Sequence, residues 1–157
     1  MGLGEYIDKH HNAKYFRQKD FDELKANEIF PGDILISRLA EPAGRTIILP
    51  YTGFRMVTAV DVTIIRPDNK KFNSSFFMTA MNRFETLKEI TEAVSGTSHK
   101  RISRKHLEEI SLDIPSLIEQ TKIGTFFKHL DSLITLQQRE LEKLKNIKKA
   151  CLEKMFA

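Results

Sequence analysis

The chain has little of what disulfide-stabilised, secreted or membrane-spanning proteins need. Its single cysteine, Cys151, excludes an internal disulfide framework and suits a reducing compartment. No stretch approaches the roughly 18 consecutive apolar residues of a membrane-spanning helix. The segment from Met1 to Tyr6 has neither a basic leader nor an apolar signal core. We therefore expect a soluble protein of the cytoplasm.

The sequence also lacks the motifs of most enzymes. It contains no GxGxxG fingerprint, no phosphate-binding glycine loop, no serine elbow and no cysteines or histidines at metal-ligand spacing. His10 and His11 are adjacent, so their side chains point in different directions. Asp33, Glu41 and Asp61 lie near predicted strands, but no lysine follows at the short range that a magnesium-dependent nuclease needs. We predict no catalytic residue, no metal site and no cofactor. The alternative of an unrecognised catalytic site requires carboxylates or histidines that converge in a pocket.

Charge is distributed unevenly along the chain. The 157 residues carry a net charge of +4, with 41% apolar content, which suffices for one domain with a core and an appendage. Before Pro115 there are 17 basic and 16 acidic residues, and after it 8 basic and 5 acidic ones. Because the first part is almost neutral, any binding of DNA would have to come from local basic patches.

The first part of the chain, residues 1–115, alternates short β-rich segments with helical ones, so we predict an α+β fold with a small curved β-sheet and packed helices. Turns at Pro31-Gly32 and Ala43-Gly44 separate the segments. The expected strands are 34–36, 46–49, 54–57, 59–65 and 110–114. The expected helices are a short one at 20–24, one long helix from residue 73 or 74 to 94 with a core-facing apolar stripe that includes Phe84, and a turn from Ser103 to Leu107.

The end of the chain, residues 116–157, has the pattern of one long amphipathic helix. Pro115 precedes it, and Ser116 with Glu119 forms a capping box. Steps of four and three residues define a heptad seam that predicts a partner helix, and the helix would span roughly 60 Å. A terminal helix folded back on its own domain is the alternative. The predicted seam consists of Ile123, Phe127, Leu130, Ile134, Gln137, Leu141, Leu144, Lys148, Cys151 and Met155, in which Gln137 and Lys148 are the polar positions.

Two segments carry the residues that could bind DNA. The run from His99 to His106 has four permanent positive charges, and the segment from Ser37 to Arg45 has an arginine on either side of a turn. Lysine and arginine bind phosphates, and arginine, serine and threonine reach base edges. A solvated charged surface is the alternative. The candidate DNA-binding residues are Ser37, Arg38, Arg45, Ser95, Thr97, Ser98, His99, Lys100, Arg101 and Arg104.

An ordered set of short motifs makes the chain resemble half of a specificity subunit of type I restriction-modification enzymes. The set begins with Gly-Asp-Ile-Leu-Ile-Ser-Arg at 32–38 and Ser95-Gly96 before the basic loop. It continues with Ile-Pro-Ser at 114–116, Glu119-Gln120 followed by Ile123, and Leu130-Asp131. It ends with the leucine-rich pattern of 141–156.

The resemblance implies a target-recognition domain at 1–115, N-terminally short, followed by a dimerisation and spacer helix at 116–157. It implies a non-catalytic subunit that reads double-stranded DNA and docks modification subunits, which methylate adenine with S-adenosylmethionine. Restriction subunits, which use ATP and magnesium, would join the assembly. The chain has one recognition domain and one helical region where the family has two of each. We therefore expect a homodimer, or pairing with another specificity half, through 123–155. The alternative is a truncated or remnant subunit that acts only through helix pairing.

Overall fold

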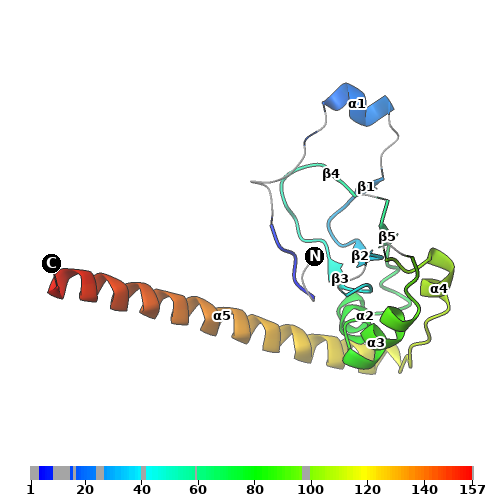
Figure 1. The fold of residues 1–157 in the computed structure, drawn as a ribbon. Helices are drawn as coiled ribbons and strands as arrows, with labels where there is room; N and C mark the ends of the chain where they lie inside the picture. The colour runs from blue at the N-terminus through cyan, green and yellow to red at the C-terminus, as the bar shows by residue number, and fades with distance from the viewer. Residues whose placement is uncertain are drawn as a thin grey trace.

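The structure, a computed structural model, describes residues 4–8, 15, 17–23, 27–39, 42–58, 60–96 and 100–156. It has an α+β fold in which a small β-rich part and several short helices pack together, and a long C-terminal helix extends away from them (Figure 1). The elements are α1 (Gln18–Glu23), β1 (Glu28–Ile29), β2 (Ile34–Ser37), β3 (Thr46–Ile48), β4 (Met56–Val57), β5 (Val62–Ile65), α2 (Ser74–Met81), α3 (Phe84–Glu92), α4 (Arg104–Glu108) and α5 (Leu117–Met155). The predicted fold class is confirmed.

The strands form two small antiparallel sheets. The larger has the order β3-β2-β5, with Leu35 of β2 opposite Ile47 and Ile64, and the smaller pairs β1 with β4. Ile34, Leu35 and Ile36 are all buried, so β2 is covered on both faces. A run of apolar residues without alternation is what such a central strand needs.

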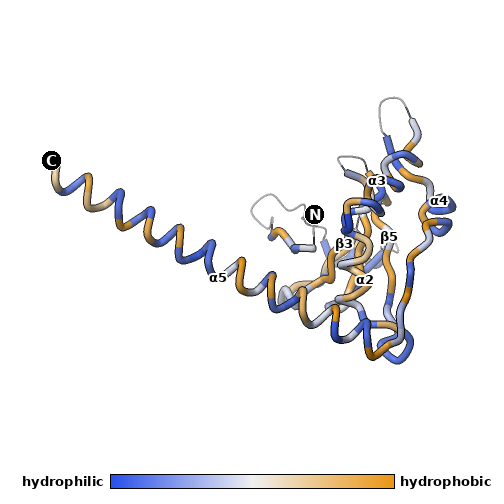
Figure 2. The backbone as a smooth tube through the Cα atoms, turned by 90° about the horizontal axis from the view of Figure 1, so that it is seen from below, coloured by the Kyte–Doolittle hydropathy of each residue, from blue (hydrophilic) through white to orange (hydrophobic). Residues whose placement is uncertain are grey.

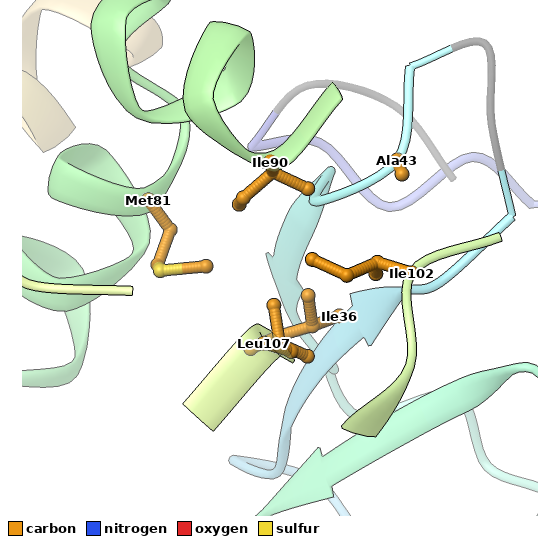
Figure 3. Close-up of a cluster of buried hydrophobic side chains, with 6 residues drawn as sticks. All are labelled: Ile36, Ala43, Met81, Ile90, Ile102 and Leu107. Carbon is orange, nitrogen blue, oxygen red and sulfur yellow. The ribbon is translucent and has the colours of Figure 1, made fainter. Parts of the chain in front are cut away.

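The two faces of β2 contact different parts of the core. Leu35 packs with Ile29, Ile47 and Leu49, and Ile36 packs with a second cluster on the helical side. In Figure 3, side chains from several elements meet around Ile36. The members of this second cluster are Ile36, Ala43, Met81, Ile90, Ile102 and Leu107. Ala43 and Ile102 belong to the two segments predicted to bind DNA, so the core fixes the position of both.

The helix predicted as continuous from residue 73 or 74 to 94 is instead two helices, and the prediction was wrong at the break. α2 ends at Asn82, whose side-chain amide bonds the backbone of Thr46 in β3: it accepts from the Thr46 nitrogen at 3.0 Å and donates to the Thr46 oxygen at 2.7 Å. These bonds fix α2 to the sheet and end it there. Phe84, placed in the core by the predicted stripe, is 77% exposed.

The predicted strand at 110–114 is also wrong, because this segment belongs to neither sheet of the described chain. Ile110 and Leu112 are partly buried against the second core cluster, whereas Ile114 is exposed. The alternating apolar residues of this segment pack against the core, but the segment has no strand partner in the described chain. By contrast, the turn capped by Ser103 is confirmed as α4, since the Ser103 hydroxyl accepts a hydrogen bond from the nitrogen of His106.

The long C-terminal helix is confirmed, with the predicted start. The Ser116 hydroxyl accepts from the nitrogen of Glu119, and the Glu119 carboxylate accepts from the nitrogen of Ser116. The Ser116 hydroxyl also donates to the Glu119 carboxylate at 2.7 Å, and this bond, together with the one from the Ser116 nitrogen, lowers the pKa of Glu119. The 39 residues of α5 span about 58 Å. From Thr125 to Phe156 every side chain except Thr135 is exposed, so the alternative of a helix folded back on its domain is wrong.

None of the described helices combines the length and the apolar character that crossing a membrane requires.

Candidate nucleic-acid interface

The two basic segments predicted from the sequence meet at one end of the larger sheet. The nitrogen of Ile102 donates to the oxygen of Arg38 at 3.0 Å, and Arg101 forms β-bridges with Leu39 and with Ser95. Ser95 and Arg101 exchange two backbone hydrogen bonds, of 3.1 and 3.0 Å. The segment after α3 therefore lies directly beside the residues that follow β2, although the two are far apart in the sequence.

Asp61, the residue before β5, joins the arginines of both segments. Its carboxylate lies 3.1 Å from Nη1 of Arg101 and 3.8 Å from Nη2 of Arg38. Its backbone oxygen accepts from the nitrogen of Arg38 at 2.8 Å. The three charged groups form one connected cluster, which we call the Asp61 cluster, consisting of Arg38, Asp61 and Arg101.

The two arginines of the Asp61 cluster differ in what they can offer a ligand. The Arg38 side chain is 15% exposed and donates through Nη2 to the backbone oxygen of Val60, whereas the Arg101 side chain is 55% exposed. A guanidinium has five donors in a fixed plane, and Asp61 occupies only one side of that of Arg101. Arg101 can therefore reach a bound molecule, and Arg38 mainly holds the cluster together.

The other predicted residues lie around this cluster or outside the described chain. Ser37 donates its backbone nitrogen to the oxygen of Arg45 at 2.9 Å, which places the half-buried Arg45 beside β2. Lys100 is exposed next to Arg101. Arg104 is exposed on α4, where it lines a cleft of about 570 Å³ along the β5 edge of the sheet. Thr97, Ser98 and His99 lie outside the described residues.

Sequence reasoning missed Asp61 as a member of this site. In the sequence, Asp61 was recognisable only as an acid near a predicted strand, without the nearby lysine of a nuclease pattern. The partners of Asp61 lie 23 and 40 residues away in the chain, so no local spacing pointed to it. An acid between two separated basic segments was the only signal available.

Nitrogen donors rather than metal ligands characterise this site. Among the described residues, no group of three histidine, cysteine, aspartate or glutamate side chains lies close enough to hold a metal ion. The exposed cations, hydroxyls and backbone amides at the sheet end suit a polyanion with hydrogen-bond acceptors, as DNA presents in its phosphates and its major groove.

Comparison with known proteins gives a consistent result. Residues 6–146 match the family model described as "Type I restriction modification DNA specificity domain". A Methanocaldococcus jannaschii protein named "Putative type I restriction enzyme MjaX specificity subunit" is 22% identical over 139 residues, which are 86% of this chain and 32% of that protein. The chain thus spans about a third of the length of this relative.

Proposed function

Because this chain belongs to the family of type I restriction-modification DNA specificity domains, we propose that it recognises one half of a DNA target and docks a modification subunit of a type I system. In this role it performs no chemistry itself and works in the cytoplasm, where its DNA lies. The observation that carries the proposal is the meeting of the two basic segments at one end of the sheet.

We assign base reading to Arg101 and phosphate binding to Lys100 and Arg104. Asp61 holds the guanidinium of Arg101 in one orientation, and a fixed planar fork suits the two acceptors on the major-groove edge of guanine. Lys100 and Arg104 are exposed positive charges on either side of the buried Ile102 in the sequence. The hydroxyls of Ser37 and Ser95 lie at the same sheet end, where they can position the backbone of the DNA. Thr97, Ser98, His99 and Arg45 complete the proposed contact set.

Asp61→Asn is expected to reduce sequence discrimination more than overall affinity. The substitution keeps the shape of the side chain but removes the charge that orients Arg101, while the net positive charge of the surface rises. A well-placed bidentate contact to a base contributes about 1–3 kcal/mol of discrimination. We therefore expect the ratio of the affinities for the selected and a scrambled duplex to fall by a factor between about 5 and about 150.

The measurement uses a target selected by the unmodified protein from randomised duplexes, with both affinities determined at one salt concentration. Asp68→Asn is the matched control, because in the described structure the Asp68 carboxylate lies on an exposed turn, where it pairs with Lys71 and accepts a hydrogen bond from the nitrogen of Lys70. Full discrimination by the Asp61→Asn protein would remove the proposed orienting role.

The exposed face of α5 supports pairing through the predicted seam. Leu130, Ile134 and Leu141 are exposed along the helix in the single chain, and Figure 2 shows apolar and polar residues alternating along it. Burying such a stripe favours association with a similar helix. We propose that two copies, or this chain and another specificity half, pair through the seam residues. A two-fold pair would read an interrupted palindrome.

The apolar face of α5 is also wider than a two-stranded seam. Phe126, Leu133 and Ile147 each lie one residue before a seam position and all are exposed, whereas Glu140 occupies the corresponding position of the heptad between Leu133 and Ile147. Three apolar positions per heptad are typical of a helix in a bundle rather than of a simple coiled coil. This flank would remain open after two α5 helices pair, and we assign it to the docking of the modification subunit. Restriction subunits would then join the assembled complex.

Light scattering tests the proposal. It measures the solution mass of the purified full chain, alone and mixed with a modification subunit from the same organism. We expect a dimer that takes up the modification subunit and binds a selected duplex with a steep dependence on salt. A dimer that ignores DNA would instead indicate a remnant that acts only through helix pairing. A monomer that takes up neither partner would refute the assignment.

A further inference from the structure

One buried side chain ties the starts of two helices together. Gln120 is 2% exposed, and its amide oxygen accepts from the nitrogen of Asn73 at 3.0 Å while its amide nitrogen donates to the oxygen of Pro115 at 2.9 Å. Asn73 is the N-cap of α2, and Pro115 immediately precedes the cap of α5. Both ends of one planar amide are thus used, which fixes the rotation of α5 relative to α2.

At the next turn the two helices approach too closely for any side chain. A Cβ atom added to Gly124 would lie 2.5 Å from Oδ1 of Asn73 and 2.8 Å from the nitrogen of Phe76. These two atoms are themselves hydrogen-bonded to each other at 3.0 Å as the cap of α2. The backbone of α5 therefore rests directly on the capped end of α2. We call Asn73, Gln120 and Gly124 the helix joint.

The helix joint lies at the base of a long lever. Gln120 and Gly124 are the buried residues that the structure gives for α5, and the remaining helix extends from the domain (Figure 1). Residues 125–155 span about 46 Å at 1.5 Å per residue. A change of about 10° at the joint would move the far end by about 8 Å, which is more than two base-pair steps of roughly 3.4 Å.

We infer that the helix joint sets the spacing between the two half-sites that a pair of these chains reads. The inference rests on the proposed pairing of α5 helices. Once the helices are paired, the position of each recognition domain along the DNA depends on the direction in which α5 leaves its own domain. The Gln120 amide, whose oxygen and nitrogen are both hydrogen-bonded, and the close approach of the backbone at Gly124 hold that direction. Gln120 and Gly124 thus act as positioning residues without contact to DNA.

Gly124→Ala tests the inference because the added methyl group must displace the α2 cap or α5 itself. The distance between spin labels reports the direction of α5 directly. We place the labels with Lys71→Cys and Lys149→Cys, both on exposed sites, in a Cys151→Ser background and dilute them with unlabelled protein. Thr125→Ala, on the neighbouring exposed position, is the matched control. We expect Gly124→Ala to shift the distance and the control to leave it unchanged.

The functional readout is the preferred spacer between two half-sites, measured on duplexes whose spacer grows one base pair at a time. We expect Gly124→Ala to move the preferred spacer by about one or two base pairs, with unchanged affinity for a single half-site. Gln120→Met, which keeps the length but removes both hydrogen bonds, is expected to broaden the label distance and the spacer preference. If circular dichroism shows that the Gly124→Ala protein does not fold, the Gln120→Met protein is used for both measurements instead.

An unchanged label distance, or a shifted distance with the original spacer preference, would overturn the inference. If the unmodified protein does not bind paired half-sites at all, the proposed function fails and the spacing role fails with it. The label distance distinguishes this failure from a failure of the helix joint, because it is measured without DNA and without a modification subunit.

Discussion

Leu130→Glu is expected to abolish the proposed pairing of α5 helices and to leave the protein as monomers. Leu130 is the third of the ten seam positions, and pairing would bury it against the same seam of the partner helix. An unpaired charge left in a buried position costs about 3–5 kcal/mol, and every 1.4 kcal/mol is about a tenfold change in affinity. We therefore expect the dissociation constant of the pair to rise by at least about a hundredfold, and Ile134→Glu should act in the same way.

Light scattering over a range of protein concentrations measures this change. Ser132→Glu is the matched control, because it adds the same charge two residues away on the opposite side of the helix, where the side chain stays in water. Circular dichroism at high concentration should show the same helix content for the Ser132→Glu control and the unmodified chain. A Leu130→Glu protein that stays associated at micromolar concentration would refute the seam assignment.

The long helix could be predicted because its determinants are local. Its start depends on Ser116 and Glu119, three residues apart, and its apolar face depends on a repeat that is visible in the sequence. The same holds for the turn capped by Ser103. Such features need no knowledge of distant contacts, and the structure confirms them.

The features that prediction missed depend on distant residues. The break at Asn82 requires the backbone of Thr46, 36 residues earlier, and a capped helix pattern alone gave no reason to end there. Asp61 likewise acquires its role only when the sheet brings Arg38 and Arg101 to it. The basic segments could be located by composition, but their meeting at one sheet end could not.

Gln120 illustrates the difference between a motif and its cause. The sequence places it in a pattern typical of the family, but the pattern does not say why an amide is needed. The structure supplies the reason, since Gln120 bonds the nitrogen of Asn73, 47 residues away. An amide offers both a donor and an acceptor, and the two groups it satisfies are one of each.

Replacing both Lys100 and Arg101 by alanine is expected to abolish most of the specific binding to DNA without unfolding the protein. Without Arg101 the protein would no longer bind a base in an interaction that contributes about 1–3 kcal/mol, and each phosphate that is no longer bound lowers the salt slope by about one. Stability should change little, because both side chains are exposed and the adjacent Ile102 stays in the core. Titration of the selected duplex at several salt concentrations, with a thermal melt of each protein, measures both effects.

The single substitutions separate the two assigned roles. Lys100→Ala should weaken binding to selected and scrambled duplexes alike, because a phosphate contact carries no sequence information. Arg101→Ala should weaken binding to the selected duplex more and relax the choice of base at one position. Lys145→Ala with Lys149→Ala removes equal charge from α5 and should leave both affinities close to their original values. Equal binding by the Lys100→Ala/Arg101→Ala protein would exclude this loop from the interface, and DNA recognition would then have to reside at the Arg45 side of the sheet end.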